Sequence, residues 1–160
     1  MKITRRHLLA LTAATSAVGA IGIGGLALHW WDQPADAPYT VLTTEEAAFI
    51  RAWGRCAFPP TPTIPLSAEE ARLDRFFDSF STVMPTDAAR LLRLLLHALN
   101  AATLPTHGDH FIDLDVQSQE EIFETWTHTD MSEFRSATQS LTLLLGMGWS
   151  IHPSVAAFKA

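Results

Sequence analysis

Apolar residues recur at intervals of three and four positions in five stretches of this chain, with polar residues between them. This spacing gathers the apolar side chains on one face of an amphipathic helix. Three stretches open with Ser or Thr followed three residues later by Glu, the signature of a helix capping box. The pattern predicts an all-α fold, a compact bundle of about five helices, over residues 43–58, 67–84, 86–102, 118–129 and 130–151.

The connections between these stretches carry residues that interrupt helices. Residues 59–66 contain four prolines, which predict a stiff extended loop. Residues 103–117 predict a loop with at most a short extended piece. The fifth stretch has a glycine-containing end, and Trp149, His152 and Pro153 are expected beyond it. They form an exposed ledge or pack as a C-terminal tail over the bundle, and both interpretations remain open.

The third stretch, residues 86–102, is the most apolar. After its first turn, its only polar positions form a narrow strip, made of Arg90, Arg93, His97 and Asn100. A helix with so little polar surface is expected to bury most of its circumference.

The N-terminus has the form of an export segment. Lys2, Arg5 and Arg6 precede residues 8–28, which contain no charged residue. The adjacent pair Arg5 and Arg6, followed by Leu8 and Leu9, resembles a twin-arginine (Tat) signal. The same apolar run is long enough to be a transmembrane anchor. Both interpretations remain open.

Residues 32–41 are rich in Pro, Ala and Asp and are interpreted as a tether. The sequence Ala-Asp-Ala at 35–37 fits a small-x-small cleavage site, but Pro38 follows it and usually blocks cleavage. Cleavage and retention of the segment are therefore alternatives. The predicted organisation is a signal or anchor with its tether over residues 1–37 and a helical domain over residues 38–160.

The net charge of the chain is −6, and the part after the export segment is slightly more acidic. Because a phosphate-binding surface needs clustered Lys and Arg, a nucleic-acid partner is excluded. Cys56 is the single cysteine, so neither an internal disulfide nor a cluster of thiolate ligands can form. Its thiol is interpreted as buried or as paired with another chain.

Motifs of common catalytic sites are absent: the sequence has no phosphate-binding glycine loop after a strand, no G-x-S-x-G and no C-x-x-C-H. His107 and His110, with Asp109, Asp113 and Asp115, are the one candidate metal cluster. Their spacing matches no helical ligand pair, so an acidic solvated loop is the favoured interpretation. No catalytic residue or metal ligand is assigned. A metal-binding enzyme using His107 and His110 and a free-standing membrane-anchored helical protein remain as alternatives.

Five segments of the chain follow one another in an order that indicates a family: the Tat-like start, the Pro-rich tether, "LTTEEAAFIRAWGRCAFPP", "LDRFFDSF" and "LLLGMGWSIHPSV". This order resembles the gluconate 2-dehydrogenase subunit 3 family. That family comprises the small (γ) subunits of bacterial membrane-bound FAD-dependent sugar and alcohol dehydrogenases. The most specific parts are the opening helix that runs to Phe58 and Pro59, and the closing segment with Trp149, His152 and Pro153.

The resemblance implies a non-catalytic accessory subunit that carries the Tat signal. Such a subunit escorts and stabilises a large flavoprotein subunit, which binds FAD in a GMC-type fold, through the Tat translocon. It implies no cofactor in this chain, a cytochrome c subunit as a further partner, and a periplasmic location, either free or anchored to the inner membrane. The expected contacts with the large subunit are Phe58, Pro59, Trp149, His152 and Pro153.

Overall fold

In the computed structural model, residue 30 and residues 33–156 are described, and this part of the chain forms helices without strands. Five helices have ten or more residues there: α3 (Thr44–Ala57), α4 (Leu73–Thr82), α5 (Thr86–Ala101), α7 (Val116–Thr127) and α8 (Ser132–Ser150). Three short helical pieces complete it: α6 (Leu104–His107), the 3-10 turn η1 (Phe111–Asp113) and α9 (Pro153–Ala156). The predicted all-α bundle is confirmed.

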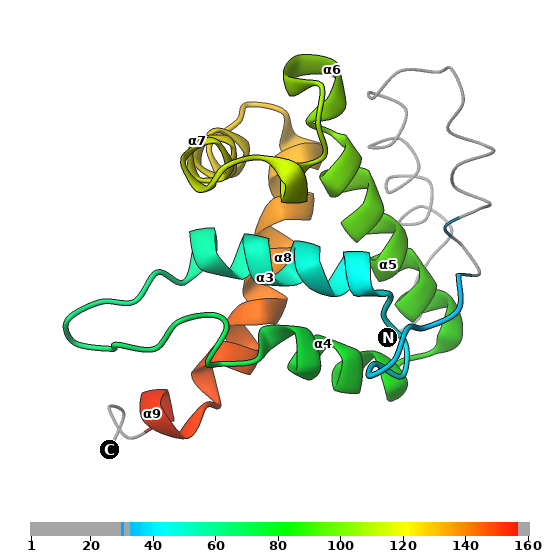
Figure 1. Cartoon of the computed structure of the whole chain (residues 1–160), viewed down its shortest axis with the longest axis vertical. Helices are drawn as coiled ribbons and strands as arrows, with labels where there is room; N and C mark the ends of the chain where they lie inside the picture. The colour runs from blue at the N-terminus through cyan, green and yellow to red at the C-terminus, as the bar shows by residue number, and fades with distance from the viewer. Residues whose placement is uncertain (1–29, 31–32, 157–160) are drawn as a thin grey trace.

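Helix α3 lies at the centre of the domain and contacts α4, α5, α7 and α8 (Figure 1). Its apolar face carries Phe49, Ile50 and Trp53, all at most 1% exposed. Trp53 contacts the rings of Phe111, Phe123 and Trp126, so the core is built around one aromatic cluster. The predicted capping box of α3 is present, because Thr43 and Glu46 exchange hydrogen bonds between side chain and backbone.

Two predicted helix starts are displaced. Ser67 and Glu70 do exchange capping-box hydrogen bonds, but Arg72 adopts a left-handed conformation (φ 51°) and ends that turn, so α4 begins only at Leu73. Helix α7 begins at Val116 rather than at Ser118, because the Asp115 carboxylate accepts the Ser118 N–H and caps the helix.

The connections also differ in part from the expectation. Residues 58–66 contain no helix, as the four prolines predict. Residues 103–117 instead contain two short helical pieces, α6 and η1, and the first two residues of α7, without an extended strand. Helix α8 continues through Gly146 and Gly148 to Ser150, one residue short of the predicted range, so the placing of Trp149 beyond the helix is wrong and Trp149 belongs to it.

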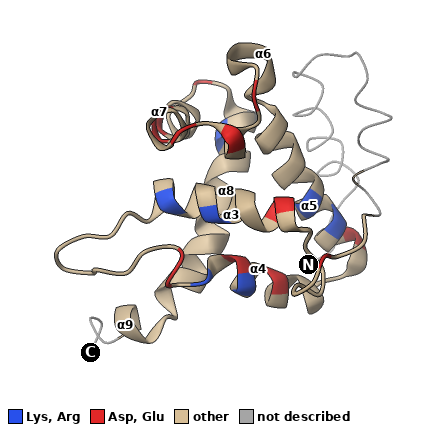
Figure 2. Cartoon of the chain, in the orientation of Figure 1, with Lys and Arg blue, Asp and Glu red and all other residues tan. Residues whose placement is uncertain are grey.

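The polar strip of α5 faces the domain interior. Arg93, His97 and Asn100 are each at most 7% exposed, whereas four leucines of the same helix, at positions 91, 92, 94 and 95, are only half-buried. The reason lies on α3, whose first turn presents Glu45 and Glu46 to this strip. Figure 2 shows these acidic positions of α3 beside the basic positions of α5.

The export segment lies outside the described residues, and so do Arg5, Arg6, Leu8 and Leu9. Within the described part, no helix combines the length and the apolar character needed to cross a membrane.

Candidate functional site

The residues predicted to contact a partner come together at one end of the domain. Phe58 and Trp149 stack with ring centroids 5.6 Å apart and an interplanar angle of 17°. Both rings are half-buried, and the Trp149 Nε1 has no hydrogen-bond partner. Pro59 and Pro153 are exposed, and His152 is half-buried between α8 and α9. The structure therefore places Phe58 and Trp149 partly in the core and leaves the two prolines at the surface.

Helix α8 presents apolar side chains to solvent next to this aromatic pair. Leu143, Met147 and Ile151 are 73%, 55% and 67% exposed, and their spacing of four residues aligns them on one face. No Asp, Glu, Lys or Arg occurs between Ser136 and Ala156. We call the surface formed by Leu143, Met147 and Ile151 the α8 outer face. Interface cores are likewise depleted of charge.

The opposite side of α8 fixes this helix to the core. Leu141 and Leu145 are at most 1% exposed, and the buried indole N–H of Trp53 donates to the Thr142 hydroxyl at 3.1 Å. Gly148 lets the ring of Phe76 on α4 approach the helix backbone closely. The α8 outer face is thus carried by a helix that is anchored along most of its length.

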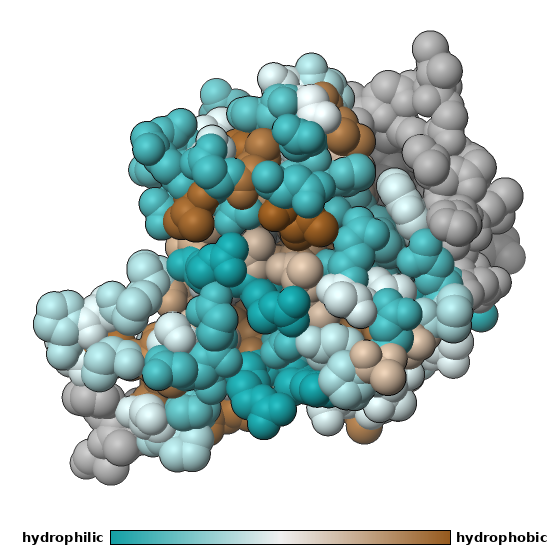
Figure 3. Space-filling view, in the orientation of Figure 1, coloured by the Kyte–Doolittle hydropathy of each residue, from teal (hydrophilic) through white to brown (hydrophobic). Residues whose placement is uncertain are grey.

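The view in Figure 3 shows a different face of the molecule, which is mostly hydrophilic over α3 and α4 and has apolar residues between α3 and α7. Charged residues elsewhere on the surface form pairs, such as Arg55 with Glu69 at 3.1 Å. The α8 outer face contrasts with it, since it contains no charged residue that could pair with a solvated partner surface.

A buried ionic cluster connects α3 to α5. The Arg93 Nε donates to both carboxylate oxygens of Glu46 at 2.8 and 3.1 Å, and the Nε2 of His97 lies 3.0 Å from Glu46 Oε1. Burial alone raises the pKa of Glu46, but His97, Arg93 and the Thr43 N–H outweigh it and hold that pKa below its ordinary value. The cluster therefore favours an ionised Glu46, and it holds the two helices in register.

The loop with His107 and His110 does not assemble a ligand set. His107 is exposed and contacts the Thr106 hydroxyl, and His110 lies 3.7 Å from Asp113 through its Nδ1. Over residue 30 and residues 33–156, no three His, Cys, Asp or Glu side chains are grouped as metal ligands. Residues 104–109, Asp113 and Asp115 are exposed to solvent.

Cys56 is a half-buried free thiol on α3. Burial, with a smaller effect from the nearby Glu120 carboxylate, raises its pKa to about 11. A thiol with this pKa is almost wholly protonated at neutral pH, and the thiolate is the nucleophilic form. Cys56 is therefore poorly suited to nucleophilic chemistry in this conformation.

The sequence analysis missed the three exposed side chains of the α8 outer face. The signal was present, because Leu143, Met147 and Ile151 follow one another at intervals of four within a long uncharged segment. The same segment also contains the stripe Phe134, Ala137, Leu141, Leu145 and Gly148, which accounts for the buried side. Helix α8 is apolar on two faces, and the core of the domain covers only one of them.

The fold and this face together define an all-helical domain that presents a rigid, uncharged apolar surface. Residues 44–146 match the family model described as gluconate 2-dehydrogenase subunit 3. Because the match spans more than half of the sequence, the chain belongs to the gluconate 2-dehydrogenase subunit 3 family. No curated protein and no solved structure shows significant similarity to the chain.

Proposed function

We propose that this chain is an accessory subunit of a periplasmic FAD-dependent sugar or alcohol dehydrogenase. In this proposal it binds the folded catalytic flavoprotein subunit, stabilises it and carries it across the membrane by means of the Tat-like signal at Arg5 and Arg6. It is not itself the catalyst, and FAD belongs to the partner. A cytochrome c subunit is a further partner of the same complex.

The observation that carries the proposal is the α8 outer face. Three large aliphatic side chains are more than half exposed on one helix face, within a segment that has no charged residue. An apolar surface of this kind on an exported protein needs a partner to cover it. The family supplies the partner, because a subunit 3 of a dehydrogenase implies other subunits of that enzyme.

The proposed contact surface extends from the α8 outer face to Phe58, Pro59, Trp149, His152 and Pro153. Trp149 and Ile151 lie two positions apart at the end of α8 and therefore point to different sides of the helix, so the proposed surface wraps around this end of α8. In a docked complex, Leu143, Met147 and Ile151 form the apolar centre, while Pro59 and Pro153 lie at the rim. An apolar centre of this kind matches the apolar core of ordinary protein interfaces.

The test is a pull-down of the full chain, tagged at its C-terminus, from the native cell. Absorbance of the eluate detects FAD, and mass spectrometry identifies the co-purifying chain. The expected result is a flavoprotein dehydrogenase in the eluate. Leu143→Asp is expected to reduce the recovered flavin at least about tenfold, because a charge placed in an apolar interface core loses its hydration.

Val116→Asp is the matched control, since Val116 is 54% exposed and lies at the start of α7, where a negative charge is favourable. This variant is expected to retain the flavoprotein. Replacement of Arg5 and Arg6 by Lys is expected to leave both subunits in the cytoplasm. A catalytic subunit that is exported and active without this chain would overturn the proposal.

A further inference from the structure

The segment that precedes α3 is bound to the domain, although its composition suggested a free tether. We call residues 36–42 the strap. The Asp36 N–H donates to the Leu42 carbonyl at 3.0 Å, and the Tyr39 N–H donates to the Asp36 carbonyl at 2.8 Å. The Asp36 carboxylate in turn accepts the Thr44 N–H at 2.8 Å. The strap therefore forms a closed turn joined to the first residue of α3.

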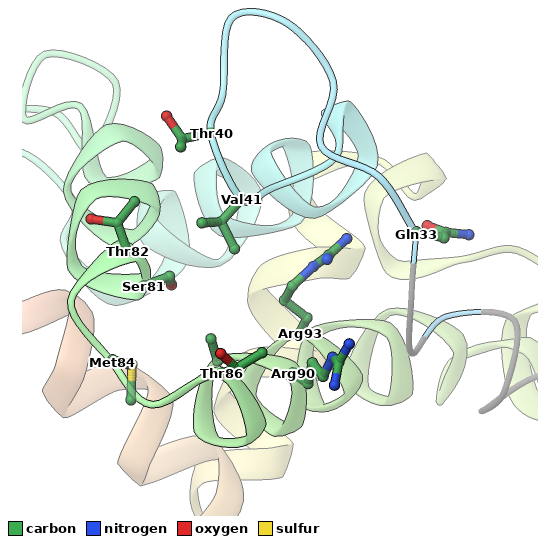
Figure 4. A pocket seen from close by; sticks show the side chains of 10 residues that line it. Gln33, Thr40, Val41, Ser81, Thr82, Met84, Thr86, Arg90 and Arg93 are labelled. Carbon is green, nitrogen blue, oxygen red and sulfur yellow. The ribbon is translucent and has the colours of Figure 1, made fainter.

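Asp78 on α4 binds the C-terminal end of the strap. Its carboxylate accepts the backbone N–H groups of Thr40, Val41 and Leu42, with Oδ1 at 3.1, 2.8 and 3.0 Å. Asp78 is only 6% exposed, so these charge-assisted hydrogen bonds are shielded from water. Figure 4 shows Thr40 and Val41 opposite Ser81 and Thr82 of α4, across an open hollow of about 450 Å³.

Tyr39, in the middle of the strap, binds side chains of α3 and α4. Its hydroxyl donates to the Asp74 carboxylate and accepts from Arg51 at 3.0 Å, and Arg51 also donates to Asp74 at 3.0 Å. The Arg75 guanidinium lies 4.5 Å from the centre of the Tyr39 ring and donates to the Pro38 carbonyl at 2.7 Å. The Pro38 carbonyl is thereby bound by Arg75 of α4, and the Tyr39 hydroxyl by Arg51 of α3 and Asp74 of α4.

Trp30, upstream of the strap, also contacts the domain. Its ring stacks on His97 of α5, with centroids 5.0 Å apart and planes 6° from parallel. His97 is 3% exposed and belongs to the Glu46 cluster. The domain therefore binds the chain at two places, at Trp30 and at the strap, which lie on either side of Ala35.

The small-x-small sequence at 35–37 lies where the strap begins. Ala37 and Pro38 are exposed, so burial does not shield this bond, and its accessibility depends on the hydrogen bonds of the strap residues around it. A peptidase acts on chain that is locally unfolded, and cleavage follows the population of that open form. The strap opposes opening here through hydrogen bonds to Asp36, Asp78 and Arg75.

We infer that the folded domain protects the bond after Ala37 from the signal peptidase, so that the uncharged run 8–28 stays attached and anchors the subunit in the membrane. This inference rests on the proposed function, since only a chain exported in the folded state presents a formed strap to the peptidase. The run of 21 uncharged residues is long enough to cross a bilayer.

The test is the intact mass of the full chain, tagged at its C-terminus and isolated from the native cell together with its partner. The expected result is a chain that retains residues 8–28 and stays in the membrane fraction after an alkaline wash. A mature chain that starts at Pro38, or one that lacks residues 8–28, overturns the inference. Export and flavin recovery are separate readouts, so failure of the proposed function is recognised independently of this mass.

Two variants separate protection by the strap from the effect of proline. Pro38→Ala removes the residue that discourages cleavage and keeps the carbonyl that Arg75 binds. In the full chain this variant is expected to remain uncut. Residues 1–42 with Pro38→Ala, fused to an unrelated folded reporter, are expected to be cut after Ala37. Cleavage of the full-length variant, or no cleavage of the fusion, contradicts protection by the strap.

Discussion

Glu46 combines two roles that are usually performed by separate residues. Its carboxylate completes the capping box with the Thr43 N–H at 2.7 Å, and it also accepts from Arg93 on α5. Its side chain is fully buried and that of Arg93 is 9% exposed, so each charge depends on the other for compensation. Removal of one member leaves an uncompensated buried charge.

Glu46→Gln is expected to lower the free energy of unfolding by roughly 3–5 kcal/mol, because Arg93 would then be buried without a carboxylate. Urea titration monitored by circular dichroism measures the change. The control is Glu69→Gln, whose partner Arg55 is solvent-accessible, and it is expected to cost less than about 1 kcal/mol. Equal effects of the two substitutions would contradict this role for Glu46.

Acid sensitivity follows from Glu46 and Asp74, whose pKa values are both lowered in the folded chain. For Asp74, burial raises the pKa, and hydrogen bonds from Tyr39, Arg75 and Arg51 overcome it. A lowered folded pKa stabilises the protein above the ordinary values of 4.5 and 3.8, and that contribution disappears as the pH falls below them.

The urea midpoint is therefore expected to be steady from about pH 7 to pH 5 and to fall between about pH 4.5 and pH 2. The fall should be shallower in the Glu46→Gln chain, which has lost one of the two groups. Midpoints measured at half-unit intervals in both chains check this. An identical slope in the two chains would show that Glu46 does not contribute.

At the scale of the helix, α8 depends on two glycines that differ in their surroundings. A Cβ added at Gly148 would overlap the ring of Phe76 on α4, whereas one added at Gly146 would lie 3.5 Å from Phe58, an ordinary contact. Glycine in a helix interior costs roughly 0.5–1 kcal/mol relative to alanine. The same substitution should thus have opposite effects two residues apart.

Gly146→Ala is expected to raise the free energy of unfolding by about 0.5 kcal/mol, and Gly148→Ala to lower it by roughly 1–3 kcal/mol through overpacking against Phe76. Differential scanning calorimetry of both chains measures the change in Tm. A neutral or stabilising Gly148→Ala would mean that α4 and α8 separate more easily than their close contact indicates.

At the scale of the whole molecule, folding and partner binding use different sides of α8. Leu143 is 73% exposed, whereas the half-buried Trp149 stacks on Phe58. Leu143→Asp is therefore expected to reduce recovery of the flavoprotein with a change in Tm below about 2 °C, in line with a surface substitution. Trp149→Ala is expected to lower the Tm by several degrees as well, because an aromatic contact is lost.

Paired Tm and pull-down measurements on the two variants distinguish these roles. A large loss of Tm in Leu143→Asp would show that this side chain supports the fold itself. Unchanged flavoprotein recovery in that variant would move the contact surface away from the α8 outer face.

Local pattern was sufficient for the five long helices and for the family, but not for the short pieces α6, η1 and α9. Apolar spacing and the Thr43–Glu46 box are set by residues a few positions apart, and the box forms as predicted. Helix starts were less certain, because Asp115 and Ser118 both carry capping side chains and only the folded backbone selects Asp115. Likewise, Ser67 begins a turn that Arg72 ends before α4.

Contacts between distant residues decided the remaining features. Glu46 and Arg93 are 47 positions apart, and their pairing turned the polar strip of α5 toward the interior, which periodicity alone does not specify. The strap became part of the domain through Asp78, some 36 to 38 residues away. Helix α8 is apolar on two faces, and its packing against α3, α4 and α7 determines which face is exposed. A one-dimensional pattern gives the period of a helix, whereas its orientation depends on which neighbours satisfy its charges and cover its apolar surface.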